Sequence, residues 1–362
     1  MTQCIVTKVN QVNAILETFR HIAVGISLIA IASAVLLFSE PTKKKGTRSV
    51  ALINYTSVPV LEDGQVGMLA GLAEGGFVNG KNIEITEFNA QGDRPTAILI
   101  AKEVVGQDFD AILTLSTPVL QAVANANLDT KKTHIFTLST DPWGAGIGID
   151  RDAPDKHPPY MTGYGTLQPV DAVFKLAREA NPKLRRVGVA WNPAESNSEA
   201  STIMARAICK QLDIELLEVN VESSSAVLEA TKSLVARNVD AIWAGGDSTV
   251  SSAMTVLVDT ANQASIPVFT NLPVDVEQGV LFSLGADYSE VGRAAGLLAT
   301  RILKGESPAE IPVENYAPQQ LAINLAVAPN FSPTWTIPED WTKRAATTVD
   351  AQGIHHQDTG TK

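Results

Sequence analysis

Two short segments of the chain carry residue types that bind a charged small molecule. Ser116 and Thr117, followed by a proline, come after the apolar run FDAILTL, and Asp247, preceded by two glycines, comes after VDAIWA. Hydroxyl groups and a proline at the start of a helix leave free backbone N–H groups that bind a carboxylate. Asp247 can accept hydrogen bonds from an ammonium or a hydroxyl group. Both segments also fit ordinary helix caps, so both interpretations stand.

Other polar and aromatic residues follow the remaining apolar runs. The polar ones are Ser139, Thr140 and Asp141 after THIFTL, Asn192 after RVGVAW, and Ser248 and Thr249 after Asp247. Tyr55 and Trp191 end equivalent runs and can stack on a flat ligand, although aromatic residues at such positions more often only pack. We take all of these residues as candidates for ligand binding.

Other kinds of site chemistry find little support. A G-x-G pattern near residue 144 lacks the helix that a dinucleotide fingerprint requires, and the chain has neither a Walker loop nor a G-x-S-x-G motif. Of five histidines, only His134 begins an expected strand, while His355 and His356 lie in a polar tail without a third ligand nearby. We therefore expect no cofactor, no metal and no enzymatic activity.

The segments that carry the candidate residues belong to a pattern that occurs twice. Residues 49–142 and 186–273 each alternate short, β-branched runs with segments of helical period, which is typical of parallel βαβ units. The expected fold class is α/β, with two Rossmann-like lobes built on parallel sheets. Ligands bind beyond the carboxyl ends of such strands, and both Ser116 and Asp247 follow the third strand of their copy. Hydroxyl groups on one side of the cleft and a carboxylate on the other favour a zwitterion over a symmetric ligand.

The order of the elements predicts that the chain crosses between the lobes three times, near 161–165, 284 and 311. Three crossings form a hinge that can open and close. We assign 1–45 to a leader or membrane anchor and linker, 46–162 and 284–310 to the first lobe, 163–283 and 311–349 to the second lobe, and 350–362 to a disordered tail.

The composition of the chain limits the classes of partner that the protein is expected to bind. The 362 residues, 45% of them hydrophobic, suffice for two cores of ordinary size, and the net charge of −11 disfavours nucleic acid. Two distant cysteines, Cys4 and Cys209, indicate neither a disulfide framework nor a metal site.

The N-terminal part contains an uncharged apolar run at 22–38, followed by PTKKKGTR. The run is typical of a signal peptide or a short hydrophobic transmembrane helix that anchors the protein, and we slightly favour the anchor. Either one predicts a periplasmic location, at the outer face of the cytoplasmic membrane. The lysines after the run predict the opposite orientation when the positive-inside rule is applied, and the two indications stay in conflict.

Residues 49–349 resemble the substrate-binding proteins of ABC transporters, in the group with tryptophan- and tyrosine-binding members. The matching segments are GLAEGGFVNGKNIEITEFNAQGD, STP, FTLSTDPWGAG, RRVGVAWNPAESNS, DAIWAGGDSTVSSA, LGADYSEVGRAAGLLATRILKGESPAEIPV and TIPEDW. The resemblance implies a type I periplasmic-binding fold that closes on a small ligand, such as an amino acid. It also implies delivery to a permease that a separate ATPase drives.

The resemblance further implies roles for individual residues. Ser116 and Thr117 would hold the carboxylate of the ligand and Asp247 its ammonium group. The cleft would be lined by Ser139, Thr140, Asn192, Ser248, Thr249, Asn271 and Asp287. The chain departs from the family pattern at the two glycines before Asp247, at Trp191, where members often have tyrosine, and in having no cysteine directly after the apolar run.

Two other classes of function remain. The same cleft can serve as a sensory module that reports a ligand to a membrane-bound signalling partner, which neighbouring genes would reveal. A hydrolase or isomerase using carboxylates in the cleft is disfavoured because no acid–base constellation is present.

Overall fold

The computed structural model describes residues 22–27, 29, 30, 33 and 46–357. The chain divides into two compact units, Met1–Thr47 and Arg48–Lys362. In the first unit, the described residues are helical up to residue 33. No helix among the described residues has the length and apolar character needed to cross a membrane. The expected N-terminal transmembrane helix is therefore not supported, and eight of the 17 residues of the run at 22–38 lie outside the described residues.

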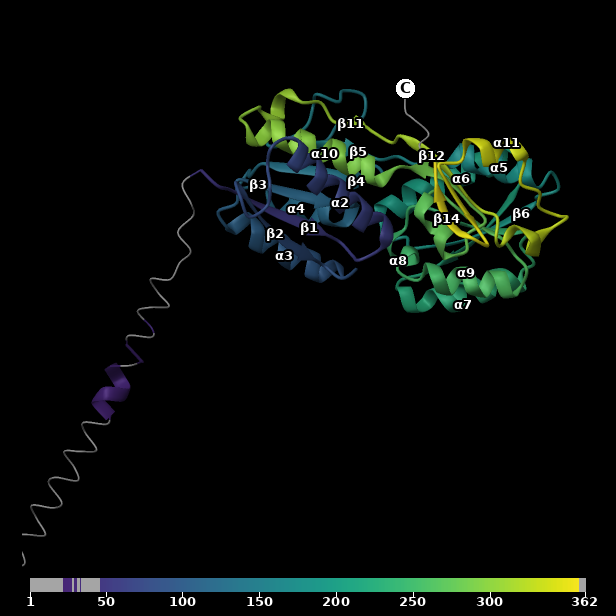
Figure 1. Ribbon diagram of the computed structural model, residues 1–362, viewed down its shortest axis with the longest axis horizontal. Helices are drawn as coiled ribbons and strands as arrows, with labels where there is room; N and C mark the ends of the chain where they lie inside the picture. The colour runs from purple at the N-terminus through teal and green to yellow at the C-terminus, as the bar shows by residue number, and fades with distance from the viewer. Residues whose placement is uncertain (1–21, 28, 31–32, 34–45, 358–362) are drawn as a thin grey trace, which may run out of the picture. The chain divides into compact units, whose positions relative to one another are not determined.

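The second unit contains two α/β lobes (Figure 1). The sheet of the first lobe has the order β11-β5-β4-β3-β1-β2, with all neighbouring strands parallel. Its strands are β1 (Arg48–Asn54), β2 (Ile83–Asn89), β3 (Ala111–Leu115), β4 (His134–Ser139), β5 (Met161–Gly165) and β11 (Glu314–Asn315). The central strand β3 is buried along its whole length because helices cover both faces of the sheet.

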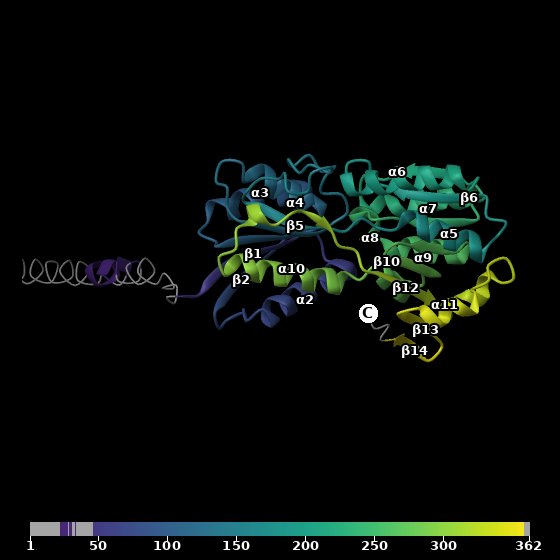
Figure 2. The ribbon, with the colours of Figure 1, turned by 90° about the horizontal axis from the view of Figure 1, so that it is seen from above.

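Four helices cover this first sheet. They are α2 (Pro59–Glu74), α3 (Arg94–Gly106), α4 (Thr117–Ala126) and α10 (Tyr288–Leu303). Helices α2 and α10 lie on one face, and α3 and α4 lie on the other (Figure 2). Two separate apolar clusters, one on each side of the sheet, correspond to these two layers.

Glycines bring α2 and α10 into close contact. A Cβ atom on Gly67 would lie 1.9 Å from the backbone oxygen of Ser289, and one on Gly292 would lie 2.0 Å from the oxygen of Gly64. Since these distances are far below van der Waals contact, only glycine allows the two helices to pack in this way. The contact fixes the position of α10, whose first residues lie at the hinge.

The second lobe has a mixed sheet of order β14-β13-β12-β10-β9-β8-β6-β7. The strands are β6 (Arg186–Trp191), β7 (Glu215–Asn220), β8 (Ala241–Ala244), β9 (Val268–Thr270), β10 (Phe282–Ala286), β12 (Gln319–Asn324), β13 (Thr347–Asp350) and β14 (Gly353–His356). The pairs β10–β12 and β13–β14 are antiparallel, whereas the other pairs are parallel.

Helices again cover both faces of this sheet. The α-helices are α5 (Val170–Ala180), α6 (Ser196–Gln211), α7 (Val227–Ala236), α8 (Ser248–Ser251), α9 (Met254–Gln263) and α11 (Glu339–Arg344). The 3-10 helices of the chain are η1 (Ser224–Ala226), η2 (Pro273–Gln278), η3 (Pro308–Glu310) and η4 (Ala328–Phe331). Helices α5, α6 and α11 pack on one face and α7 and α9 on the other. The α/β architecture with two lobes agrees with the sequence prediction, although the second sheet also has antiparallel strands.

The chain passes between the two lobes after β5, after β10, and between β11 and β12. The sequence placed these crossings near 161–165, 284 and 311, a few residues too early, because an apolar run does not reveal which sheet its backbone joins. The disordered tail expected from residue 350 is also corrected. Residues 353–356 form β14, which pairs with β13 through backbone hydrogen bonds that leave no apolar pattern in the sequence. Residues 358–362 lie outside the described part.

Candidate ligand-binding cleft

The cleft between the lobes has three adjoining compartments. The inner compartment is lined by Val58, Val60, Leu61, Ser116, Thr117, Leu138, Thr140, Asn197, Gly246, Asp247, Ser248, Ser251, Leu272 and Tyr288. It shares Ser248 with a larger, polar outer compartment of about 490 Å³. It shares Val60 and Tyr288 with a hinge-side compartment of about 250 Å³. The inner compartment therefore lies between a polar mouth and the hinge.

Ser116 and Thr117 of the first lobe contribute hydroxyl groups to the inner compartment. Ser116 links β3 directly to α4, with a backbone φ of 98° that is rare for a residue other than glycine. Its buried Oγ has no hydrogen-bond partner in the described chain, and the side chain does not cap α4. Such a conformation costs on the order of 1–3 kcal/mol and is common at binding sites. The side chain of Ser116 therefore does not act as the helix cap that the sequence left open.

Asp247 forms the centre of the polar part of the second lobe. Its side chain is buried, with 3% of its surface exposed. Its carboxylate accepts hydrogen bonds from the Asn192 N–H at 2.6 Å, the Ser198 Oγ at 2.5 Å and the Val250 N–H at 2.8 Å. The bond from Val250 makes Asp247 the cap of α8 as well as a residue of the cleft. Burial, together with the nearby Glu195, raises the pKa of Asp247 to about 7.

Glu195 is a second buried carboxylate that the sequence analysis did not include among the site residues. It accepts hydrogen bonds from the Ser248 N–H at 2.9 Å and from the Thr249 N–H at 3.0 Å. The Thr249 Oγ1 donates a further bond at 2.6 Å. Glu195 thus occupies the N-terminus of α8, where a ligand carboxylate would otherwise find free N–H groups. The second lobe is suited to a cation, and the first lobe to an anion.

The structure brings eight of the predicted site residues to the inner and outer compartments of the cleft. Ser116, Thr117, Thr140, Asp247 and Ser248 line the inner compartment, and Tyr55, Asn192 and Thr249 line the outer one. Asn197 and Ser251 also line the inner compartment, although neither was among the predicted site residues. Ser251 lies one helical turn after the predicted Ser248 in α8, and this spacing is the signal that could have found it.

Of the other five predicted residues, Asp287 lies in the hinge-side compartment and four lie outside the cleft. Ser139 is beneath the inner compartment, bonded to Thr117 at 3.0 Å. Asn271 is buried beside the Trp243 Nε1, at 3.0 Å. Trp191 belongs to the core of the second lobe and stacks on Arg206. Asp141 pairs with Arg151 at 2.6 Å, and Asp287 lines the hinge-side compartment.

An apolar wall faces the polar residues of the inner compartment, and the sequence analysis missed it. It consists of Val58, Val60, Leu61, Leu138, Leu272 and Tyr288. All six also belong to the apolar cluster of the first lobe. Because the same side chains serve the core and the cleft, no pattern in the sequence distinguishes them from ordinary core residues.

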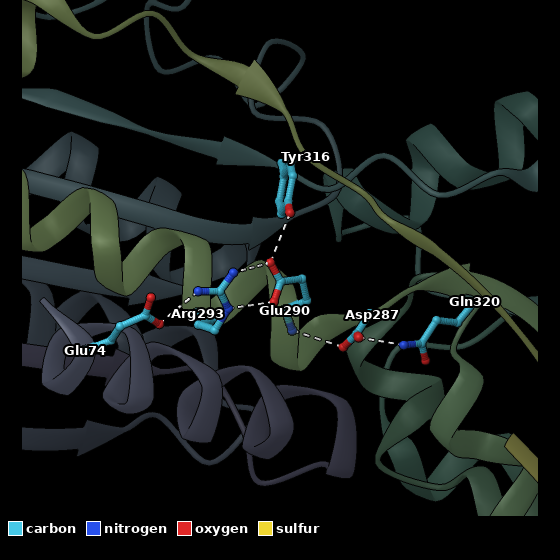
Figure 3. Close-up of polar contacts among 6 residues, drawn as sticks. All are labelled: Glu74, Asp287, Glu290, Arg293, Tyr316 and Gln320. Atoms are coloured by element: carbon cyan, nitrogen blue, oxygen red, sulfur yellow. Dashed lines mark hydrogen bonds and ion pairs between the residues drawn. The ribbon is translucent and has the colours of Figure 1, made fainter. Parts of the chain in front are cut away.

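The hinge side of the cleft is held by polar contacts around the start of α10 (Figure 3). The Asp287 carboxylate caps α10 at the Glu290 N–H and accepts a bond of 2.5 Å from the Gln320 Nε2. The Arg293 guanidinium pairs with both Glu290 and Glu74, and the Tyr316 hydroxyl contacts Glu290 at 3.1 Å. These contacts connect the second crossing of the chain to the third.

A second set of contacts connects the first crossing to the second. The buried Gln168 accepts a hydrogen bond from the Ala286 N–H at 3.0 Å. Its Nε2 donates to the Tyr288 hydroxyl at 2.9 Å. Since Tyr288 also lines the inner compartment, a residue of the cleft is in direct contact with the hinge.

Comparison with known proteins places this architecture in a family. Residues 49–349 match the family model described as ABC transporter substrate binding protein. The chain belongs to this family. No group of three or more histidine, cysteine or acidic residues suited to a metal ion occurs among the residues that the structure describes.

Three similar proteins illustrate the family. A tyrosine-binding protein of Clostridioides difficile is 30% identical over 286 residues, 79% of this chain and 81% of that protein. A structure from Streptococcus pneumoniae in complex with L-Trp has 25% identity and a TM-score of 0.77, covering 84% of this chain and 100% of that one. A ligand-free, open substrate-binding protein of Clostridium difficile has 26% identity and a TM-score of 0.62, covering 84% and 99%.

Proposed function

We propose that the protein is the solute-binding component of an ABC importer and captures an α-amino acid between its two lobes. The observation that carries the proposal is the distribution of polarity in the inner compartment. Hydroxyl groups and a helix N-terminus lie on the first lobe, Asp247 lies on the second with Glu195 in the adjoining outer compartment, and an apolar wall continues toward the hinge-side compartment. These three features correspond to the carboxylate, the ammonium group and the side chain of an amino acid.

The ligand carboxylate binds at the start of α4 in this proposal. Ser116 offers an unpartnered hydroxyl group there, since its Oγ is buried without a partner among the described residues. The N-terminus of α4 adds the positive end of the helix dipole and free N–H groups. Thr117 contributes a second hydroxyl group, which Ser139 orients from below.

The ligand ammonium group binds at Asp247. A carboxylate offers about four acceptor positions, and the three hydrogen bonds from its own lobe leave one for the ligand. Glu195 adds negative potential without needing to contact the ligand. The three groups that donate hydrogen bonds to Asp247 are neutral, so its buried negative charge is costly. A bound cation compensates that charge.

Closure of the lobes completes the site. In this structure Arg94 of the first lobe donates a hydrogen bond of 3.1 Å to the Ala194 oxygen of the second. The higher TM-score to the structure with L-Trp than to the open one, at similar identity, supports a closed arrangement. A ligand that contacts both lobes only when they are closed shifts the population toward this state.

Membership of the family supports the transport role. We propose that the closed, liganded lobes lie on the outer side of the cytoplasmic membrane and dock on a permease, which a separate ATPase drives. A tyrosine-binding relative and a relative in complex with L-Trp support an amino acid as the cargo.

A thermal-shift screen tests the proposal. Binding to the native state raises the melting temperature, so the full chain should be stabilised by at least one L-amino acid. The same compound without its amino group or without its carboxylate should stabilise it much less. Asp247→Asn should remove the shift, while Asp141→Asn, which changes an aspartate outside the cleft, should keep it. The proposal fails if sugars or other neutral compounds stabilise the protein and amino acids do not.

A further inference from the structure

Leu138 has an unusual backbone conformation for a residue inside a strand. Its φ is 54°, and the pairing between β4 and β5 shifts register between Phe136 and Ser139. A positive φ is unfavourable for a leucine because its Cβ crowds the backbone. A register shift of this kind re-aims a side chain that regular alternation would direct elsewhere. The strand therefore adopts an unfavourable backbone conformation that directs this one side chain.

The side chain of Leu138 lies at the apolar end of the inner compartment. It is 4% exposed and packs in the same cluster as Val58, Leu61 and Leu272. A Cβ on Gly64 of α2 would lie 2.2 Å from the Leu138 Cδ1, so the absence of a side chain at Gly64 makes room for Leu138. This close packing leaves the Leu138 side chain little freedom to move when a ligand binds.

The space that remains is small. The inner compartment offers about 40 Å³ to the centres of water molecules, against about 490 Å³ in the outer compartment. A single water needs on the order of 10–15 Å³ on this scale. The polar residues border the outer compartment through Ser248, and the apolar wall borders the hinge through Val60 and Tyr288. An amino acid held at Ser116 and Asp247 thus directs its side chain toward Leu138.

We propose that Leu138 limits the size of the ligand side chain and that the protein selects α-amino acids with a short aliphatic side chain over aromatic ones. This inference rests on the proposed function and narrows its ligand class. The proposed ligand of this chain thus differs from those of two relatives, one named as a tyrosine-binding protein and one solved in complex with L-Trp. An aromatic ring would meet Leu138 before the lobes reached the closed arrangement.

Calorimetric titration of the full chain tests the inference. The probes are L-alanine, L-valine, L-phenylalanine and L-tryptophan. We expect the better of the two aliphatic probes to bind at least about tenfold more tightly than either aromatic one, since each methylene in an apolar pocket changes affinity by roughly 10–200-fold. Leu138→Ala should change the ratio of aliphatic to aromatic affinity by at least about tenfold in favour of the aromatic probes.

Two further variants control the interpretation. Leu138→Gly removes the side chain and also the strain of the positive φ, so it remains informative if the alanine variant folds poorly. Leu113→Ala removes a fully buried leucine of the same cluster that does not line the cleft. It should lower stability and leave the affinity ratio unchanged.

Three outcomes contradict the inference, and they differ in what else they overturn. If the wild-type protein binds L-tryptophan or L-phenylalanine as tightly as the aliphatic probes, only the size limit is wrong. The same holds if neither Leu138 variant changes the ratio. If no α-amino acid binds at all, the proposed function fails and the size limit fails with it.

Discussion

Thr140 of the first lobe and Gly246 of the second approach each other so closely that a Cβ on Gly246 would lie 3.2 Å from the Thr140 Oγ1. The two residues line the inner compartment from opposite sides. Since a Cβ contact at this distance is already tight, the glycine permits the lobes to close fully. Its lack of a side chain therefore bears on ligand affinity more than on folding.

A bulky residue at this position should hold the lobes apart. We expect Gly246→Val to lower ligand affinity at least about tenfold, because about 1.4 kcal/mol of lost closure energy corresponds to that factor. The melting temperature of the ligand-free protein should change little. Gly106→Val is the matched control, because nothing but its chain neighbours and the backbone of its own helix lies within 4 Å of the position of its Cβ. Equal affinities of Gly246→Val and wild type in calorimetry would show that closure does not require the glycine.

The pH dependence of binding should follow Asp247. The pKa of this carboxyl group is raised to about 7 by burial and by Glu195. Below that pH the group binds a proton, which an ammonium ligand must displace. Affinity should therefore fall as pH decreases below about 7, by up to about tenfold per unit.

Titrations between pH 5 and 8 check this slope. In Asp247→Asn the affinity should be lower throughout and this pH dependence should be lost. Asp141→Asn should keep the wild-type slope. A wild-type affinity that stays constant across this range would argue against a direct contact between Asp247 and the ligand ammonium.

Asp275 should make stability depend on pH. This residue of η2 is 3% exposed, and its Oδ2 has no partner among the described residues. Burial raises its pKa to about 7. A raised carboxyl pKa gives stability that is fully present below the unfolded value, near 4, and is lost as pH rises through about 7.

Chemical denaturation at pH 5 and pH 8 measures this effect. The unfolding free energy of wild type relative to Asp275→Asn should decrease between the two pH values, by roughly 2–4 kcal/mol. Comparison with the variant removes the contribution of Asp247, which titrates in the same direction in both proteins. A parallel pH dependence in both proteins would mean that Asp275 is already ionised in the folded protein at both pH values.

The contact between α2 and α10 should be sensitive to a single methyl group. In Gly67→Ala the new Cβ would collide with the backbone oxygen of Ser289, which cannot rotate away. We expect a loss of about 3 kcal/mol in unfolding free energy, at the upper end of the usual cost of overpacking. Urea denaturation measures it, with Gly106→Ala expected to be neutral or slightly stabilising. A Gly67→Ala protein as stable as wild type would show that the helices can separate at little cost.

The part of the site that could be predicted from the sequence consists of polar residues at strand ends. Ser116 and Asp247 follow equivalent strands of the two copies, so the topology of parallel sheets alone brings them to the cleft. The same reasoning selected Trp191, which also ends a strand, and the family resemblance added Asn271. Their side chains point into the core, because the position of a residue along a strand does not give the direction of its side chain.

The remaining features depend on contacts distant in sequence. Leu138 reaches the cleft through a register shift between β4 and β5, which leaves no local signal. Glu195 acts through hydrogen bonds to N–H groups more than fifty residues away. The strand β14 exists because β13 pairs with it. The two-lobed fold, in contrast, was predictable because its apolar runs repeat at regular spacing in two copies.

Calorimetric titration at pH 8 with the L-amino acid that gives the largest thermal shift tests the central claim most directly. We predict one bound ligand per chain and at least about tenfold weaker binding of the analogues that lack either the amino group or the carboxylate, since each charge-assisted hydrogen bond contributes roughly 1.5–3 kcal/mol. If an analogue lacking one charged group binds as tightly as the amino acid, capture of a zwitterion between Ser116 and Asp247 is contradicted.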